Sequence, residues 1–185
     1  MLATALPARL SSFLVALLAM LATVGCGSGV ARSTSLATIG ALPAGPSGAT
    51  QNARVVRVVD GDTVIVRIAG AEYRLRYIGI NAPESVTPGA PVERMGHEAA
   101  AANLALVAGR DVTLEKDVSE SDRFGRLLRY VWLHDGDDWL LVNRELVRRG
   151  FANAVTYPPD VKYQEDLREA EAEARAARVG LWARP

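Results

Sequence analysis

Two short β-branched segments that flank an Asp-Gly turn limit the fold of this chain more than any other feature. Residues 54–59 and 63–68 are rich in valine and isoleucine, and Asp60-Gly61 between them is a strong hairpin signal. A third segment, 72–78, follows the small-residue turn at 69–71 and alternates apolar or aromatic side chains with arginines. Alternation of this kind is typical of a strand with one buried face, so we expect a three-stranded antiparallel meander.

The rest of the sequence adds further strands and helices after an irregular, proline-containing segment at 79–92. The pattern predicts strands at 112–116 and 126–133, and helices at 93–108, at 140–149 and after Pro158-Pro159. The last helix is expected to bury one stripe, namely Tyr163, Leu167, Ala170, Ala174, Ala177 and Leu181. Five strands with these helices fit a mainly β member of the α+β class, a five-stranded OB-fold Greek-key barrel with three helices. The order of the strands is not set by the pattern alone.

The first 52 residues differ in composition from the remainder. Residues 1–26 have one early positive charge, a short apolar stretch and then small residues, which predicts an export signal peptide. The run that ends at Cys26 resembles a bacterial lipoprotein signal, in which this cysteine carries the lipid; ordinary cleavage nearby is the alternative. Residues 27–52, rich in Gly, Ser, Ala and Pro, suggest a flexible linker. We expect an exported protein, either a cell-surface lipoprotein or a secreted or periplasmic one, with its folded domain at 53–185.

Charge and cysteine content exclude several classes of protein. Arg9 and Arg32 are the only charged residues before position 53, so residues 53–185 have a formal charge of −2. A protein that coats nucleic acid by neutralising its phosphates is strongly basic, so the slightly negative charge of residues 53–185 disfavours a non-specific coating role. The single cysteine excludes an intramolecular disulfide and a zinc site built from several thiolates, so the domain depends on an ordinary apolar core.

Three separated segments place charged residues where the pattern predicts a turn or a strand end. These segments are 60–63, 76–84 and 122–126. The first two offer side-chain and backbone oxygens that suit a hard cation, and the last two contain arginines, whose planar guanidinium groups suit a phosphate. Each residue alone has a bland explanation as a turn or surface residue. Together they form the set that hydrolysis of a phosphodiester requires.

Four ordered motifs carry a family resemblance. Residues 59–63 (VDGDT), 76–84 (RYIGINAPE), 122–126 (DRFGR) and 146–150 (LVRRG) follow the order and approximate spacing of the thermonuclease family, so the chain resembles staphylococcal-nuclease-like domains from about residue 53 to Trp182. This resemblance implies an OB-fold, calcium-dependent endonuclease. Its expected substrates are DNA and RNA, preferably single-stranded or frayed, and its expected products end in 3′-phosphate. We expect a monomer.

The resemblance also implies a role for individual residues. It gives Asp62, Asn81 and the backbone carbonyl of Ala82 as Ca²⁺ ligands, Arg76 and Arg126 as catalytic residues that bind the scissile phosphate, and Glu84 as the catalytic carboxylate that activates water. Phe124 and Tyr157 are expected to contact the substrate.

Three of these positions differ from the family pattern or match it loosely. Asn81 stands where the family often has aspartate, so we expect weaker calcium binding. Phe124 replaces a frequent tyrosine and lacks its hydroxyl group. Tyr157 is within one position of a tyrosine that stacks on a base, and Thr156 competes for that alignment.

Two other classes of function compete with a nuclease. One is a catalytically weak or inactive OB-fold module that binds nucleic acid at the cell surface, because this fold occurs in many binding proteins. The other is a lipoprotein scaffold for a protein partner. Arg76, Glu84 and Arg126 together favour the enzyme, because a pure binder does not need that combination.

Overall fold

The computed structural model describes residues 44–85, 93–136 and 138–183. The expected signal peptide, Cys26 and most of the expected linker lie outside these ranges. No helix in the described ranges has the length and apolar character needed to cross a membrane.

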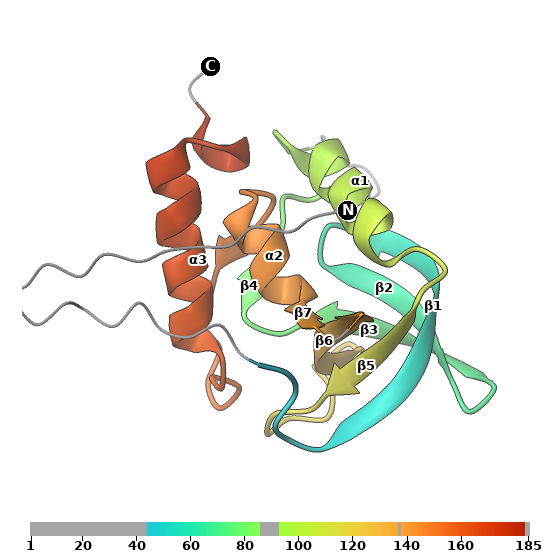
Figure 1. Cartoon of the computed structure of the whole chain (residues 1–185). Helices are drawn as coiled ribbons and strands as arrows, with labels where there is room; N and C mark the ends of the chain where they lie inside the picture. Colours follow the sequence, from blue (N-terminus) through green and yellow to red (C-terminus); the bar gives the residue numbers. More distant parts are fainter. Residues whose placement is uncertain (1–43, 86–92, 137, 184–185) are drawn as a thin grey trace, which may run out of the picture. The chain divides into compact units, whose positions relative to one another are not determined.

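A closed five-stranded barrel forms the body of the molecule (Figure 1). Its strands are β1 (Thr50–Asp60), β2 (Thr63–Ile68), β3 (Ala71–Tyr77), β5 (Asp111–Glu115) and β6 (Leu127–Asp135). They pair in the order β3-β2-β1-β5-β6, with antiparallel neighbours, and a parallel pairing of β3 with β6 closes the barrel. The predicted OB-fold barrel is therefore confirmed, and so is the antiparallel meander at its start.

Within the described residues, three helices and three short strands complete the fold. The helices are α1 (Gly96–Val107), α2 (Val142–Arg148) and α3 (Gln164–Ala177), followed by a 3₁₀ turn at Gly180–Trp182. The short strands are β4 (Ile80–Asn81), which pairs with β8 (Asn153–Ala154), and β7 (Asp138–Leu141), which pairs with β6. In Figure 1, α2 lies between α3 and the barrel, and α1 lies across the barrel at the β1–β2 end.

Alternation along the strands fills the barrel. Val64, Val66 and Leu75 point inward and are fully buried, whereas the arginines that alternate with them on β2 and β3 point outward. At the β1–β2 loop, a Cβ atom on Gly61 would lie 2.6 Å from Ala82 Cβ and 2.9 Å from Ala99 Cβ. Glycine is thus required here for the close approach of α1 and β4 to the loop.

Element boundaries differ from the prediction in four places. β1 starts at Thr50, because residues 50–52 pair with Thr113–Glu115 of β5. Residues 138–141 form a strand that folds back on β6 instead of starting a helix at 140. α1 begins only at Gly96, because Met95 has a left-handed backbone conformation (φ 70°) that a right-handed helix cannot continue. At the end of the last helix, Ala177 is exposed, so the buried stripe of α3 stops at Ala174.

Candidate active site

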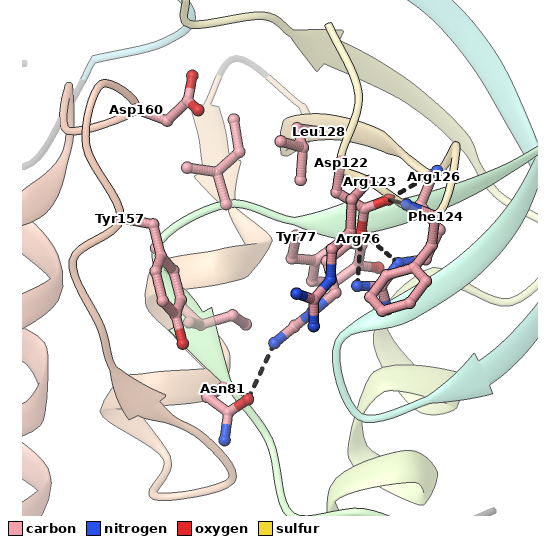
Figure 2. Close-up of a pocket in the computed structure, with 13 residues that line it drawn as sticks. Arg76, Tyr77, Asn81, Asp122, Arg123, Phe124, Arg126, Leu128, Tyr157 and Asp160 are labelled. Atoms are coloured by element: carbon pink, nitrogen blue, oxygen red, sulfur yellow. Dashed lines mark hydrogen bonds and ion pairs between the residues drawn. The ribbon is translucent and has the colours of Figure 1, made fainter. Parts of the chain in front are cut away.

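Closure of the barrel brings the three charged segments together. Arg76 is near the end of β3, and its register partner in the parallel pairing is Leu128 of β6, two residues after Arg126. The tight turn at 122–126 therefore lies beside Arg76. A cavity of about 510 Å³ opens there, shown in Figure 2, and its lining includes five of the predicted site residues: Arg76, Asn81, Phe124, Arg126 and Tyr157.

Arg76 connects the two predicted metal-binding side chains. Its Nη1 forms an ion pair with Asp62 Oδ2, and its Nη2 donates a hydrogen bond to Asn81 Oδ1 at 3.0 Å. The Arg76 side chain is 14% exposed and that of Asp62 is 7% exposed. Since one guanidinium spans both oxygens, Asp62 and Asn81 are close enough to act on a common centre.

The Asp62 carboxylate is held firmly at the β1–β2 loop. Oδ1 accepts a hydrogen bond from the Thr63 hydroxyl at 3.1 Å, and Oδ2 accepts one from the Ala82 backbone N–H at 2.7 Å. Burial raises the pKa of Asp62, while Arg76 and these two hydrogen bonds oppose the rise. The Ala82 contact connects β4 to the loop, so two segments that are 20 residues apart are fixed relative to each other.

Asp122 fixes the second predicted arginine. Its Oδ2 accepts a hydrogen bond from Arg126 Nε and forms an ion pair with Arg126 Nη2, both at 2.6 Å. Its Oδ1 accepts hydrogen bonds from the backbone N–H groups of Phe124 and Arg126. Burial tends to raise the pKa of Asp122, but the bonds from Arg126 and Phe124 outweigh it, and the pKa is lowered. Asp122 thereby holds the turn and the guanidinium at once, and Arg126 Nη1 is directed to neither carboxylate oxygen.

Aromatic rings stand at two sides of the cavity. Figure 2 shows Phe124 on one side of Arg76 and Tyr157 on the other. The two rings belong to residues that are 68% and 65% exposed, so their faces are available to a ligand. The guanidinium carbons of Arg123 and Arg126 lie 4.8 and 5.5 Å from the centre of the Phe124 ring. Exposed rings and cations in one cavity are the contacts that unpaired bases and phosphates use.

Glu84 is not part of the cavity lining. It lies beside Asp60, whose pKa is raised by burial first and also by the Glu84 carboxyl group. Its backbone N–H donates to Glu93 Oε2 at 3.1 Å, and its backbone carbonyl accepts from the Glu93 N–H at 3.0 Å. The half-buried Glu84 is thus positioned by the segment that leads into α1.

The available donors suit a hard cation. Asp62 and Asn81 provide side-chain oxygens, and Ala82 adds a backbone carbonyl next to them, which is an all-oxygen set of the kind that calcium prefers. Within the described ranges, no three His, Cys, Asp or Glu side chains gather around one point. A cation here would depend on amide and carbonyl oxygens as well as the single carboxylate.

Comparison with known proteins matches this geometry. The family model described as staphylococcal nuclease homologue matches residues 74–184. The chain is 40% identical over 132 residues to the thermonuclease of Staphylococcus hyicus, which is 71% of this chain and 76% of that protein. It is 38% identical to the thermonuclease of Staphylococcus intermedius over 70% of this chain and 75% of that protein. The chain belongs to the staphylococcal nuclease family.

A third relative extends the comparison beyond the staphylococci. Endonuclease YncB of Bacillus subtilis is 33% identical over 72% of this chain and 62% of that protein. This member of the staphylococcal nuclease family is accordingly a nuclease, a hydrolase whose substrate is nucleic acid.

Sequence reasoning missed two residues that position this nuclease's site. Asp122 stands in the motif at 122–126 but received no role of its own from the sequence, although its place at the start of a tight turn that ends in glycine is a recognisable signal for backbone capping. Asn103, fully buried in α1, accepts a hydrogen bond from the Tyr77 hydroxyl at 2.9 Å and donates one to the Asp60 carbonyl at 2.8 Å. Nothing in the pattern of α1 marks Asn103, because only the packing of α1 on the barrel gives it partners.

Proposed function

We propose that this nuclease hydrolyses the phosphodiester bonds of DNA and RNA in a calcium-dependent reaction and leaves 3′-phosphate ends. The observation that carries the proposal is the convergence of Arg76 and Arg126 on one cavity beside the Asp62 and Asn81 oxygens. The thermonuclease relatives support the same reaction type.

Asp62, Asn81 and the Ala82 carbonyl are the residues that would hold the calcium ion. When bound, the ion supplies positive charge that neutralises a non-bridging phosphate oxygen. Asn81 contributes an oxygen without a negative charge, so the calcium requirement is expected to be high.

The two arginines bind the scissile phosphate. An arginine has five N–H donors, and those of Arg76 and Arg126 that are not used by Asp62, Asn81 and Asp122 remain available to phosphate oxygens. As charge builds on the phosphoryl oxygens during attack, these preorganised donors strengthen their hydrogen bonds. Arg126 is in addition the donor that stabilises the departing 5′-oxygen.

Glu84 is the proton acceptor for the attacking water. The water oxygen forms a bond to phosphorus in line with the P–O5′ bond, its proton passes to the Glu84 carboxylate, and the P–O5′ bond breaks. The 5′-oxygen takes up a proton from solvent water and leaves as a hydroxyl group, while the phosphate, which keeps the oxygen and the second proton of the attacking water, stays on the 3′-oxygen. Phe124 and Tyr157 hold the flanking bases, which favours single-stranded or frayed substrates.

We further propose that the enzyme acts outside the cytoplasm as a monomer. The signal-like residues 1–26 support export, and Cys26 provides a lipid anchor if the signal is of the lipoprotein type. Without lipidation the same signal leads to a secreted or periplasmic enzyme. Labelling with a radioactive fatty acid distinguishes the two, because a Cys26→Ser variant loses the label only in a lipoprotein.

The decisive experiment measures cleavage of a single-stranded DNA and a single-stranded RNA by the purified protein over a calcium titration, with a chelator control and end-group analysis. Glu84→Gln and Arg126→Ala are compared with Glu165→Gln and Arg168→Ala, which make the same changes on the exposed face of α3. Loss of one preorganised donor lowers kcat by roughly a hundredfold to a thousandfold, so Arg126→Ala should fall in this range while the α3 controls match the wild type. Intact substrate at millimolar calcium, with retention of DNA on a filter, would identify a binding module instead.

A further inference from the structure

A row of arginines on the outer face of β1, β2 and β3 is not used by the proposed reaction. Arg57 of β1 and Arg74 of β3 are both register partners of Ile65 of β2, so they flank it in one cross-strand row. The neighbouring row contains Arg54, Arg67 and Glu72 in the same way. All four arginines are exposed.

The two rows differ in how their charges are compensated. Arg54 Nη1 lies 3.0 Å from Asp111 Oδ1, and Arg67 Nη2 lies 2.6 Å from Glu72 Oε1. Among the described residues, no carboxylate lies within ion-pair distance of Arg57 or Arg74. The Arg57/Arg74 row is therefore a site of uncompensated positive charge in a domain whose formal charge is −2.

This row borders a hollow that also contains apolar surface. The hollow has a volume of about 430 Å³ and is lined by Val56, Arg57, Ile65, Glu72, Tyr73 and Arg74. The carboxylate of Glu72 is paired with Arg67. Tyr73 is 43% exposed and Val56 is 37% exposed, which is unusual for large apolar side chains on this barrel. Two exposed arginines without a carboxylate partner suit the phosphates of a single strand of nucleic acid. Tyr73 is the register partner of the buried Val66, so its side chain leaves the face of β3 opposite to Arg74 and is not part of this row.

The row is continuous with the active site along β3. Arg74 and Arg76 are separated by one residue, so their side chains leave the same face of the strand about 6.8 Å apart. Arg76 faces the catalytic cavity, and Arg74 is the next outward side chain away from it. A strand of nucleic acid that leaves the cavity along β3 meets Arg74 and then Arg57.

We propose that Arg57 and Arg74 form a second binding surface for the single-stranded nucleic acid substrate, outside the catalytic cavity. The identity of the ligand rests on the proposed function. The added site would let the enzyme bind a longer stretch of the same strand.

The test measures binding rather than cleavage. Fluorescence anisotropy with a labelled oligodeoxythymidylate of roughly twelve nucleotides, within the site size of an OB-fold, is carried out on the full chain with excess chelator over a series of salt concentrations. Each phosphate contact to a single strand contributes about 0.7 to the slope of log K against log salt, so Arg57→Ala/Arg74→Ala should reduce the slope by about 1.4. Tyr73→Ala, which changes the opposite face of β3 and removes no charge, should leave the slope unchanged.

Arg54→Ala/Arg67→Ala is the matched control. It removes two exposed arginines from the neighbouring row of the same sheet and changes the formal charge equally, but both of its arginines are already neutralised by carboxylates. The proposal is overturned if the two double variants reduce the slope equally, or if Arg57→Ala/Arg74→Ala keeps the slope of the wild type. Thermal unfolding checks that both variants are folded, and the exposure of these side chains predicts unchanged midpoints.

Two more measurements separate this proposal from its alternatives. With an oligonucleotide of roughly four nucleotides, the lower end of an OB-fold site, the wild type should bind more weakly than with the longer strand, and the Arg57→Ala/Arg74→Ala variant should lose most of this difference. Vesicles that contain anionic lipid test the other polyanionic partner: vesicle binding that depends on Arg57 and Arg74, with DNA binding unaffected, overturns the proposal. Because the chelator prevents metal-dependent cleavage, a failure of the proposed catalysis leaves the outcome of this test readable.

Discussion

A buried glutamate at the end of β5 offers the most direct test of how the barrel is stabilised. The Glu115 side chain is fully buried, and it accepts hydrogen bonds from the Ser47 N–H (3.1 Å), the Gly48 N–H (2.7 Å), Trp132 Nε1 (2.8 Å) and the Tyr163 hydroxyl (2.9 Å). Lys162 Nζ forms an ion pair with its Oε1. One carboxylate thereby ties together β6, the start of α3 and the residues just before β1.

Glu115→Gln keeps the shape of the side chain and removes its charge. In either orientation the amide NH₂ group then faces donors: Lys162 and the two backbone N–H groups at the Oε1 position, or Trp132 Nε1 and the Tyr163 hydroxyl at the Oε2 position. A buried polar group is left unsatisfied. Removal of one partner from a buried ion pair costs about 3–5 kcal/mol. The lower end applies here, because the Lys162 side chain is 27% exposed and can regain water. With a urea m value of about 2 kcal/mol/M, a loss of about 3 kcal/mol lowers the unfolding midpoint by about 1.5 M.

The loss of stability caused by Glu115→Gln should depend on pH. Burial by itself would raise the pKa of Glu115, but the bonds from Lys162, Tyr163, Trp132 and Ser47 outweigh it and hold the pKa below its ordinary value. A carboxylate with a lowered pKa in the folded state contributes its stability in full above the unfolded pKa of about 4.3. This contribution disappears as the pH falls through the folded pKa, so the difference between wild type and variant should shrink in acid.

Urea unfolding followed by tryptophan fluorescence, at neutral pH and in steps down to about pH 3, which spans the ordinary glutamate pKa, measures both effects. Glu165→Gln, at a glutamate whose side chain is 89% exposed, is the matched control and should leave the midpoint unchanged. A midpoint for Glu115→Gln within about 0.25 M of the wild type, equivalent to roughly 0.5 kcal/mol, would refute the reasoning. A difference in midpoint between wild type and Glu115→Gln that stays constant as the pH is lowered would refute it as well.

Three further changes test the site and its support. Asp122→Ala should lower kcat/KM by up to roughly a hundredfold, because Arg126 keeps its charge but loses its orientation. Steady-state cleavage kinetics measure this effect, and a loss as large as that of Arg126→Ala would contradict a purely positioning role for Asp122. Asn81→Asp should lower the calcium concentration for half-maximal activity by roughly tenfold, which corresponds to about 1.4 kcal/mol, because it adds a negative charge to the donor set. A calcium titration of the cleavage rate measures this, and an unchanged calcium requirement would show that residue 81 is not a calcium ligand. Gly61→Ala should destabilise the fold by about 1–3 kcal/mol, because the added methyl group meets the Cβ atom of Ala99 at 2.9 Å as well as that of Ala82. Thermal unfolding measures this loss, and a midpoint equal to that of the wild type would show that α1 shifts to accommodate the methyl group at no cost in stability.

Local chemistry in the sequence determined the elements of this fold. The β-branched segments on either side of Asp60-Gly61 are strands, because alternation along a half-buried strand is visible in a few residues. The stripe from Tyr163 to Ala174 is the buried face of α3 for the equivalent reason at helical spacing. The ordered motifs were enough to identify the family, because each of them combines a turn with a charged residue that the turn alone does not need.

Tertiary structure decided what these elements do together. The parallel pairing of β3 with β6 brings Arg76 to the turn that holds Arg126, and no local pattern encodes a contact between strands about 50 residues apart. Residues 50–52 carry no strong strand signal, yet they form a strand because the edge of β5 offers them hydrogen-bond partners. Asp122, Asn103 and Glu115 owe their roles to the same cause. A buried polar side chain is stabilised only by partners that meet it in three dimensions, whereas propensity and periodicity act between neighbours along the chain.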